Sequence, residues 1–236
     1  MRHVVVERAE VTLAAKDLAK EYAGTPVLRD ITLDVHVAES LAVMGPSGSG
    51  KSTLLKCLAG ILRPSRGSVT FDGAALEELD AEERSAIRLR RFGFVYQDGQ
   101  LLPELDVREN AALLLLLNGV KRRTALEQAQ ASLDRLGVGR LADRRLNQIS
   151  GGEAQRVAIA RSLSSEPAVL FADEPTGSLD ATTGGEVIGA LLEAIEEQGT
   201  TVILITHDQT VAARADRLVF LHDGRLEPAE AHAVIP

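Results

Sequence analysis

The stretch that most constrains this chain is segment 45–53, GPSGSGKST, between an apolar run at 41–44 and a helix-forming run at 52–59. It fits the pattern G-x-x-x-x-G-K-[ST]. A strand, a glycine-rich loop and a helix N-terminus direct backbone N–H groups and a helix dipole at one point, which favours phosphate. Lys51 can reach the β- and γ-phosphates, and the Ser52 hydroxyl can ligate Mg²⁺. An ordinary Gly/Ser loop would not need these flanks, so the segment predicts a nucleotide site made by Gly45, Ser47, Gly48, Gly50, Lys51, Ser52 and Thr53.

The composition excludes several classes of protein. The 236 residues carry a formal charge of −8, which disfavours a nucleic-acid footprint or a polybasic membrane patch. A single cysteine, Cys57, excludes an internal disulfide framework and is expected as a buried thiol. The apolar run within residues 1–10 is too short for a signal peptide. The run Ala111–Leu117 is far shorter than the roughly 20 residues of a membrane helix. We therefore expect a cytoplasmic protein that reaches a membrane only through another protein.

Strand and helix patterns alternate along the chain, which predicts an α/β fold with a parallel core and an antiparallel portion near the N-terminus. Helical patterns dominate from 98 to 166 and predict a helical insertion. We expect a single domain over 1–236, with its core at 1–97 and 167–236. The expected strands are 11–17, 27–37, 41–44, 68–71, 92–96, 168–172, 201–205 and 217–221, and the expected helices are 52–59, 77–91, 106–118, 121–136, 152–165 and 182–198.

Two further elements suit phosphate chemistry. Asp173 and Glu174 follow the buried strand 168–172, where a carboxylate can hold Mg²⁺ through water and its neighbour can polarise an attacking water. Segment 149–153, ISGGE, opens a helix with a serine and two glycines, a second anion-binding end. Because the chain has one phosphate loop, this second end suggests a nucleotide held between two chains. Read alone, the pair 173–174 is an exposed acidic pair at the end of a strand, and segment 149–153 is a helix cap.

These motifs, in this order, resemble the nucleotide-binding ATPase subunit of ABC transporters over about residues 10 to 227. Segment 45–53 matches the Walker A motif, and segment 169–174 matches Walker B with the catalytic glutamate. Segment 149–153 matches the LSGGQ signature, and segment 178–180, SLD, matches the D-loop. Three single residues fall at family positions: Gln97 at the Q-loop glutamine, His207 at the switch histidine and Tyr22 at the aromatic that stacks on adenine.

The resemblance implies the P-loop NTPase fold of the ABC ATPases, with a RecA-like parallel core, an N-terminal antiparallel β portion and an inserted helical subdomain. It implies ATP and Mg²⁺ as ligands and hydrolysis of ATP as the activity. The implied roles are catalytic for Glu174, His207 and Gln97, metal-binding for Ser52, Gln97 and Asp173, and nucleotide-binding for the phosphate loop with Tyr22, Ser150, Gly151, Gly152 and Asp180. The implied partners are a second copy and an integral membrane permease, which places the chain at the cytoplasmic face of the membrane, and no nucleic acid.

Local sequence similarity narrows the resemblance to the macrolide-exporter and lipoprotein-release branch of the family. The signature departs from the family pattern at two residues: Ile149 replaces leucine and Glu153 replaces glutamine. Glutamate at this last position of the signature is familiar in that branch. Its members pair with permeases that have few transmembrane helices and a large external domain. The alternatives are an importer ATPase, a non-transport ABC ATPase and a P-loop kinase. A non-transport ATPase usually carries a long coiled coil or a second ATPase domain, and a kinase would not explain segment 149–153 or His207.

Overall fold

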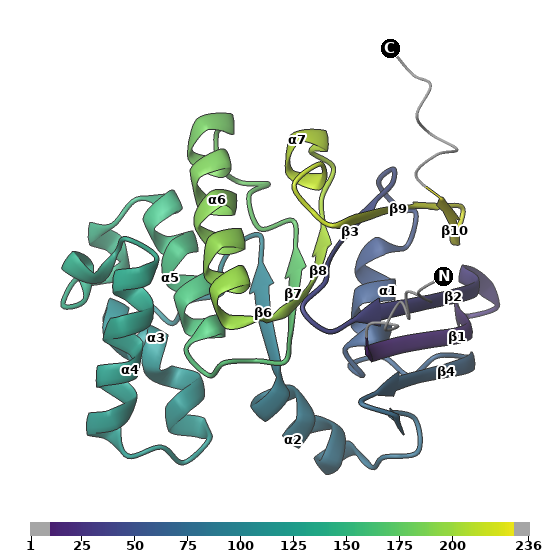
Figure 1. Cartoon of the computed structure of the whole chain (residues 1–236), viewed down its shortest axis with the longest axis horizontal. Coiled ribbons are helices and arrows are strands. Elements are labelled where there is room, and N and C mark those ends of the chain that lie inside the picture. Colours follow the sequence, from purple (N-terminus) through teal and green to yellow (C-terminus); the bar gives the residue numbers. More distant parts are fainter. Residues whose placement is uncertain (1–9, 229–236) are drawn as a thin grey trace, which may run out of the picture.

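The computed structural model describes residues 10–228, which form two sheets flanked by helices (Figure 1). The apolar run at residues 4–6 lies outside the described residues, as do both ends of the expected 1–236 domain. The mixed α/β architecture agrees with the sequence prediction. One sheet has four antiparallel strands in the order β2-β1-β4-β5, and the other has six strands in the order β10-β9-β3-β8-β7-β6.

The antiparallel sheet is built from β1 (Val11–Tyr22), β2 (Thr25–His36), β4 (Arg66–Phe71) and β5 (Ala74–Ala75). The first strand is longer than the predicted 11–17 and ends at Tyr22. A two-residue turn joins Tyr22 to Thr25, with left-handed backbone at Ala23 (φ 48°) and Gly24 (φ 80°), as a tight hairpin needs. A bulge near Asp17 (φ 48°) breaks the alternation of apolar residues, which hides this extension in the sequence.

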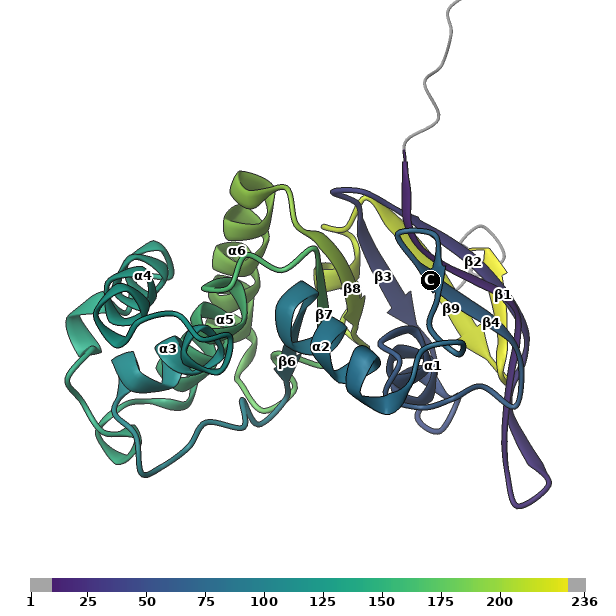
Figure 2. The same ribbon diagram turned by 90° about the horizontal axis from the view of Figure 1, so that it is seen from below.

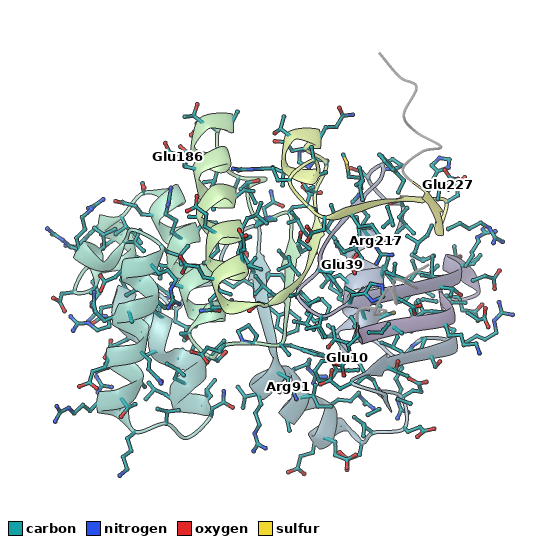
Figure 3. All side chains as sticks on the ribbon, in the orientation of Figure 1. Glu10, Glu39, Arg91, Glu186, Arg217 and Glu227 are labelled. Carbon is teal, nitrogen blue, oxygen red and sulfur yellow. The ribbon has the colours of Figure 1, made fainter. Side chains whose placement is uncertain are left out.

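The larger sheet contains the parallel core. Its strands are β3 (Ser40–Met44), β6 (Phe92–Tyr96), β7 (Val169–Asp173), β8 (Thr201–Ile205), β9 (Arg217–His222) and β10 (Arg225–Pro228). All neighbours are parallel except the β9–β10 hairpin, whose second strand the sequence pattern did not predict. Arg217, at the start of β9, forms an ion pair with Glu39 just before β3 (Nε to Oε1, 2.6 Å; both residues are labelled in Figure 3).

The central strands are buried on both faces, and their side chains alternate between two cores. In β7, Val169 and Phe171 belong to one core, while Leu170 and Ala172 belong to the other. The first core lies against the antiparallel sheet and α1 (Lys51–Leu58), which packs between the two sheets (Figure 2). The second core lies against α5 (Gly151–Leu163) and α6 (Ala181–Gln198). A continuous apolar run is what a strand covered on both faces requires.

Three helices form the region that the sequence predicted as an insertion. They are α3 (Val107–Leu117), α4 (Arg122–Arg135) and α5 (Gly151–Leu163), which lie side by side at one end of the molecule (Figures 1 and 2). The connection from α4 to α5 includes short 3₁₀ turns at Gly139–Leu141 and Leu146–Gln148. The apolar run is divided between two environments: Ala111 is buried in this helical core, whereas Leu117 is 61% exposed.

The remaining helices are α2 (Ala81–Arg91), α6 (Ala181–Gln198) and α7 (Gln209–Ala212). Several helices begin at sequence signals for capping. Asp80 caps α2 and Asp106 caps α3, each with a reciprocal glutamate, and Asp180 caps α6. Gly199, with left-handed backbone at φ 64°, ends α6. Within residues 10–228, none of the helices has the length and apolar character to cross a bilayer.

Candidate functional site

The helix that follows the phosphate loop begins without a protein cap. Gly50 precedes α1 with left-handed backbone (φ 104°), no side chain accepts from the first N–H groups, and the first turn carries no acidic residue. By contrast, α2, α3 and α5 each begin with a reciprocal capping box. A Cβ on Gly50 would lie 3.0 Å from the Val27 carbonyl oxygen, so the position has little space for a side chain. The N-terminus of α1 is therefore left free for an external anion.

A cavity of about 700 Å³ opens at this helix end. The parallel strands β3, β8, β7 and β6 are neighbours, so the residues that follow them meet at one edge of the sheet. The cavity collects nine predicted site residues: Ser47, Gly48, Gly50, Lys51, Ser52, Thr53, Gln97, Asp173 and Glu174. Gly45 is not among the lining residues; a Cβ there would lie 2.1 Å from the Leu221 carbonyl oxygen, so glycine is required by packing against β9.

Lys51, Ser52 and Asp173, which line the cavity, are held by hydrogen bonds. The Lys51 ammonium donates to the carbonyl oxygens of Gly45 (2.8 Å) and Pro46 (3.0 Å), which keeps the charge over the loop. The Ser52 hydroxyl donates to Asp173 Oδ1 at 3.3 Å. Burial raises the pKa of Asp173, and the bond from Ser52 partly opposes the rise. Asp173 is the last residue of β7 rather than the residue after the strand, so its side chain is held by the sheet.

Glu174 has a backbone conformation that is uncommon for a glutamate. Its φ is 49°, in the left-handed region that a glutamate adopts only at a cost. Its N–H donates to the Ile205 carbonyl oxygen (3.0 Å), which ties it to the end of β8. There, Nδ1 of His207 lies 2.7 Å from Glu174 Oε2. The structure thus brings together two of the predicted catalytic residues.

The third predicted catalytic residue, Gln97, lies beside the same carboxylate. A Cβ added to Gly177 would be 3.0 Å from Gln97 Nε2 and 3.3 Å from Glu174 Oε2, so both side chains flank this glycine. The Ser178 hydroxyl donates to the Gln97 carbonyl oxygen at 3.1 Å. Gln97 and Glu174 therefore approach one point, and both line the cavity.

The predicted signature residues Ser150, Gly151 and Gly152 begin α5 and do not line this cavity. Ser150 caps the helix together with Glu153, whose Oε2 accepts from the Ser150 N–H at 2.9 Å. This bond is the main cause of the lowered pKa of Glu153. Arg140 pairs with the other carboxylate oxygen (2.6 Å), so the charge that glutamate adds to this helix end is balanced within the chain.

Three further predicted residues lie outside the lining of this cavity: Asp180, His207 and Tyr22. Asp180 caps α6 by accepting from the N–H groups of Thr182 and Thr183, both at 3.1 Å. With His207 it lines a smaller cavity of about 200 Å³ that adjoins Glu174. Tyr22, at the tip of the β1–β2 hairpin, is 45% exposed, and its ring lies 5.2 Å from the Lys20 ammonium.

Four lining residues were not among the sequence-predicted site residues: Val27, Tyr96, Asp98 and Ser178. Tyr96 and Asp98 flank Gln97, so the motif around that residue was a usable signal. Ser178 belongs to the predicted D-loop. Val27 lies near the start of β2, and only the sheet that carries it to the phosphate loop reveals its position.

The comparisons with known proteins agree with this geometry. The sequence profile of the ABC transporter family matches residues 28–177. The chain belongs to this family. It is 43% identical over 208 residues to the lipoprotein-releasing system ATP-binding protein LolD of Shewanella denitrificans, covering 88% of this chain and 89% of the relative. It is also 44% identical over 219 residues to the macrolide export ATP-binding/permease protein MacB of Syntrophobacter fumaroxidans. The predicted branch of ABC ATPase cassettes is therefore confirmed.

The chain covers only part of the length of the export relatives. The chain spans about a third of MacB (31%) and of the pyoverdine export protein PvdT of Pseudomonas aeruginosa (32%). Among solved structures, the ATP-binding cassette MJ0796, in a dimeric post-hydrolysis state bound to ADP and Pi, matches with a TM-score of 0.82 and 36% identity, covering 91% of this chain and 96% of that one. The predicted ABC ATPase fold is confirmed by this match.

Proposed function

We propose that this ABC cassette hydrolyses MgATP at sites shared by two head-to-tail copies, and that the cycle moves a membrane permease subunit. The observation that carries the proposal is the division of the predicted site within one chain. Lys51, Asp173 and Glu174 line one cavity, whereas Ser150–Gly152 open a different helix outside it. A second copy can bring its own α5 to the cavity, and the dimeric state of the ADP- and Pi-bound relative supports this arrangement.

The residues have distinct tasks in such a site. The free N–H groups of α1 and the Lys51 ammonium bind the phosphates. Glu174 accepts the proton of the attacking water, and His207 holds the Glu174 carboxylate from its Oε2 side. Gln97 lies beside that carboxylate, where its amide can orient the water. Tyr22 is proposed to stack on adenine and Asp180 to contact the second copy.

The site also fits Mg²⁺. Bound there, the ion would neutralise charge on the β- and γ-phosphate oxygens. The Ser52 hydroxyl and the Asp173 carboxylate are oxygen donors of the kind Mg²⁺ prefers, and they already converge at 3.3 Å. Gln97 lines the same cavity. In the described part of the chain, no group of three or more His, Cys, Asp or Glu side chains could hold a metal alone, so the phosphates would complete the coordination.

The permease is proposed from the relatives. LolD is named as the ATP-binding protein of a lipoprotein-releasing system, and MacB and PvdT as export ATP-binding/permease proteins. We propose a permease of that kind, with few transmembrane helices and a large external domain. The cassette would be held at the cytoplasmic face of the membrane through it. An importer ATPase is the alternative within the family.

Shared sites predict that two inactive variants complement each other. Lys51→Ala removes the phosphate ligand of one half, and Gly151→Asp adds a negative charge at the α5 end, where the nearest side-chain atom to a new Cβ is 3.6 Å away. Each variant alone should be nearly inactive. Half of the dimers in an equal mixture would carry one intact site of two, so turnover should recover to roughly one quarter of native.

The matched control is Gly185→Asp on α6, where a Cβ meets nothing within 4 Å; it should keep native turnover alone and in mixtures. The assay is phosphate release at fixed total protein. If the mixture of Lys51→Ala and Gly151→Asp stays as inactive as its components, each site lies within one chain and the shared-site proposal is wrong.

The permease proposal predicts what the chain captures from native membranes. The Glu174→Gln variant with MgATP should hold the closed state and recover a permease with a large external domain, identified by mass spectrometry. The Lys51→Ala variant should recover less of the same protein because it binds nucleotide poorly. A compact permease with a separate binding protein would favour the importer, and a DNA- or ribosome-associated partner would contradict transport.

A further inference from the structure

The loop between β6 and α3 is fastened to α5 by side chains. The Gln155 amide donates to the Tyr96 carbonyl oxygen at 2.9 Å. The Arg161 guanidinium donates to the carbonyl oxygens of Gly99 (Nη2, 2.8 Å) and Gln100 (Nη1, 2.7 Å). These bonds hold the loop on both sides of Gln97 and Asp98. The connection is irregular in backbone but fixed in place by one helix.

Arg161 is a buried cation that carries no direct role in phosphate chemistry. Only 9% of the residue is exposed, and burial lowers the pKa of its guanidinium. Its guanidinium donates to two loop carbonyl oxygens rather than to a carboxylate. A buried charge is costly unless its hydrogen bonds are well made. The two hydrogen bonds to loop carbonyl oxygens therefore offset the cost of burying this guanidinium.

The loop backbone needs such support. Gly99 (φ 64°) and Gln100 (φ 46°) have consecutive left-handed conformations, and for glutamine this conformation is unfavourable without outside contacts. A guanidinium is a planar fork that can bind two carbonyl oxygens at once, whereas an ammonium is a single point charge. Lysine at position 161 would thus keep the charge but would not bind the carbonyl oxygens of Gly99 and Gln100 in the same two-pronged geometry.

Gln97 is one of the two residues enclosed by these bonds. Its own carbonyl accepts from the Ser178 hydroxyl at 3.1 Å, so its backbone is held from three directions. The same α5 begins at Ser150, the end proposed to meet the nucleotide of a second copy. Arg161 lies eleven positions after Ser150, which is roughly 16 Å at the rise of an α-helix. One rigid element therefore touches both the signature end and the Gln97 loop.

We propose that Arg161 is a positioning residue that fixes the Gln97 loop to α5, so that Gln97 and the signature end move as one body. This inference rests on the proposed role of Gln97 in hydrolysis. Contact of the signature end with the second copy's nucleotide would then set the position of Gln97 at the chain's own site. The two sites would be coupled through α5.

A double-mutant cycle tests the proposal on the full chain, with native protein, Arg161→Lys, Gln97→Ala and the double variant. We measure kcat and KM for MgATP, the Mg²⁺ concentration for half-maximal turnover, and the melting temperature. Misplacement of a positioned group can cost up to about a hundredfold, so Arg161→Lys should lower kcat by roughly 10- to 100-fold with little change in KM. In the Gln97→Ala background, Arg161→Lys should have no further effect on kcat or on the Mg²⁺ requirement.

The matched control is Arg156→Lys on the same helix. Its guanidinium donates to the Leu136 carbonyl oxygen (3.3 Å) and to Glu186 (3.4 Å), which lies on α6 and is labelled in Figure 3. Because neither contact touches the Gln97 loop, kcat should stay within about twofold of native, as expected for an isolated surface pair. If Arg161→Lys melts below the assay temperature, Gln155→Leu replaces it, since it removes the hold on Tyr96 without removing a charge.

The outcomes separate the inference from the proposed function. Native turnover in Gln97→Ala would remove Gln97 from the mechanism and overturn the inference, while the shared-site ATPase proposal would stand on its own complementation test. Loss of turnover in Gln97→Ala, with the same further loss from Arg161→Lys in both backgrounds, would show that Arg161 acts independently of Gln97 and overturn the inference alone. Native turnover in Arg161→Lys would also overturn it. Loss that vanishes in the Gln97→Ala background supports it.

Discussion

Replacing Glu174 with glutamine is expected to leave ATP binding close to native and to lower turnover by about 10²- to 10⁴-fold, the range for loss of a general base. The side chain keeps its shape and can still meet Nδ1 of His207, which lies 2.7 Å from Oε2 in the native chain. The amide cannot accept the proton of the attacking water. ATP would then remain bound, and the two-chain assembly should accumulate in the closed form.

Phosphate release, ATP binding and size-exclusion chromatography with MgATP measure the three parts of this expectation. The control is Glu196→Gln on α6, an exposed carboxylate remote from the cavity lining, which should change none of them. Turnover near native in Glu174→Gln would remove Glu174 from its proposed role. Loss of ATP binding would instead make it a binding residue.

Replacing Lys51 with alanine is expected to weaken nucleotide binding itself. The ammonium lies over the loop, bonded to the carbonyl oxygens of Gly45 and Pro46, at the entrance to the free end of α1. A hydrogen bond to a charged group contributes about 1.5–3 kcal/mol, so the dissociation constant for ATP should rise by roughly 10- to 150-fold. Isothermal titration calorimetry with ATP and Mg²⁺ gives this value directly.

The control for that prediction is Lys56→Ala on the same helix. Lys56 is exposed and lies in the last turn of α1, away from the phosphate end, so its removal should change ATP affinity by less than about twofold. Native affinity in Lys51→Ala would contradict the proposed phosphate contact. Equal losses in the two variants would point to a general charge effect instead.

The sequence predicted those elements whose signals are local. The strand at 201–205 agrees residue for residue with β8, and β6 agrees at 92–96. Continuous apolar runs, glycine loops and capping serines depend only on neighbours in the chain, which explains this success. The hairpin extension of β1 to Tyr22 and the strand β10 were missed because a bulge and a tight turn interrupt their patterns.

Residue type and order alone identify the phosphate loop, the acidic pair at 173–174 and the family. Which of these residues meet depends on how the strands and helices pack. The 2.7 Å approach of His207 to Glu174 follows from the pairing of β7 with β8, two strands separated by a whole helix in the chain. The separation of Ser150 from the cavity, and the grip of Arg161 on the loop of Gln97, likewise follow from the packing of α5, which sequence spacing does not encode.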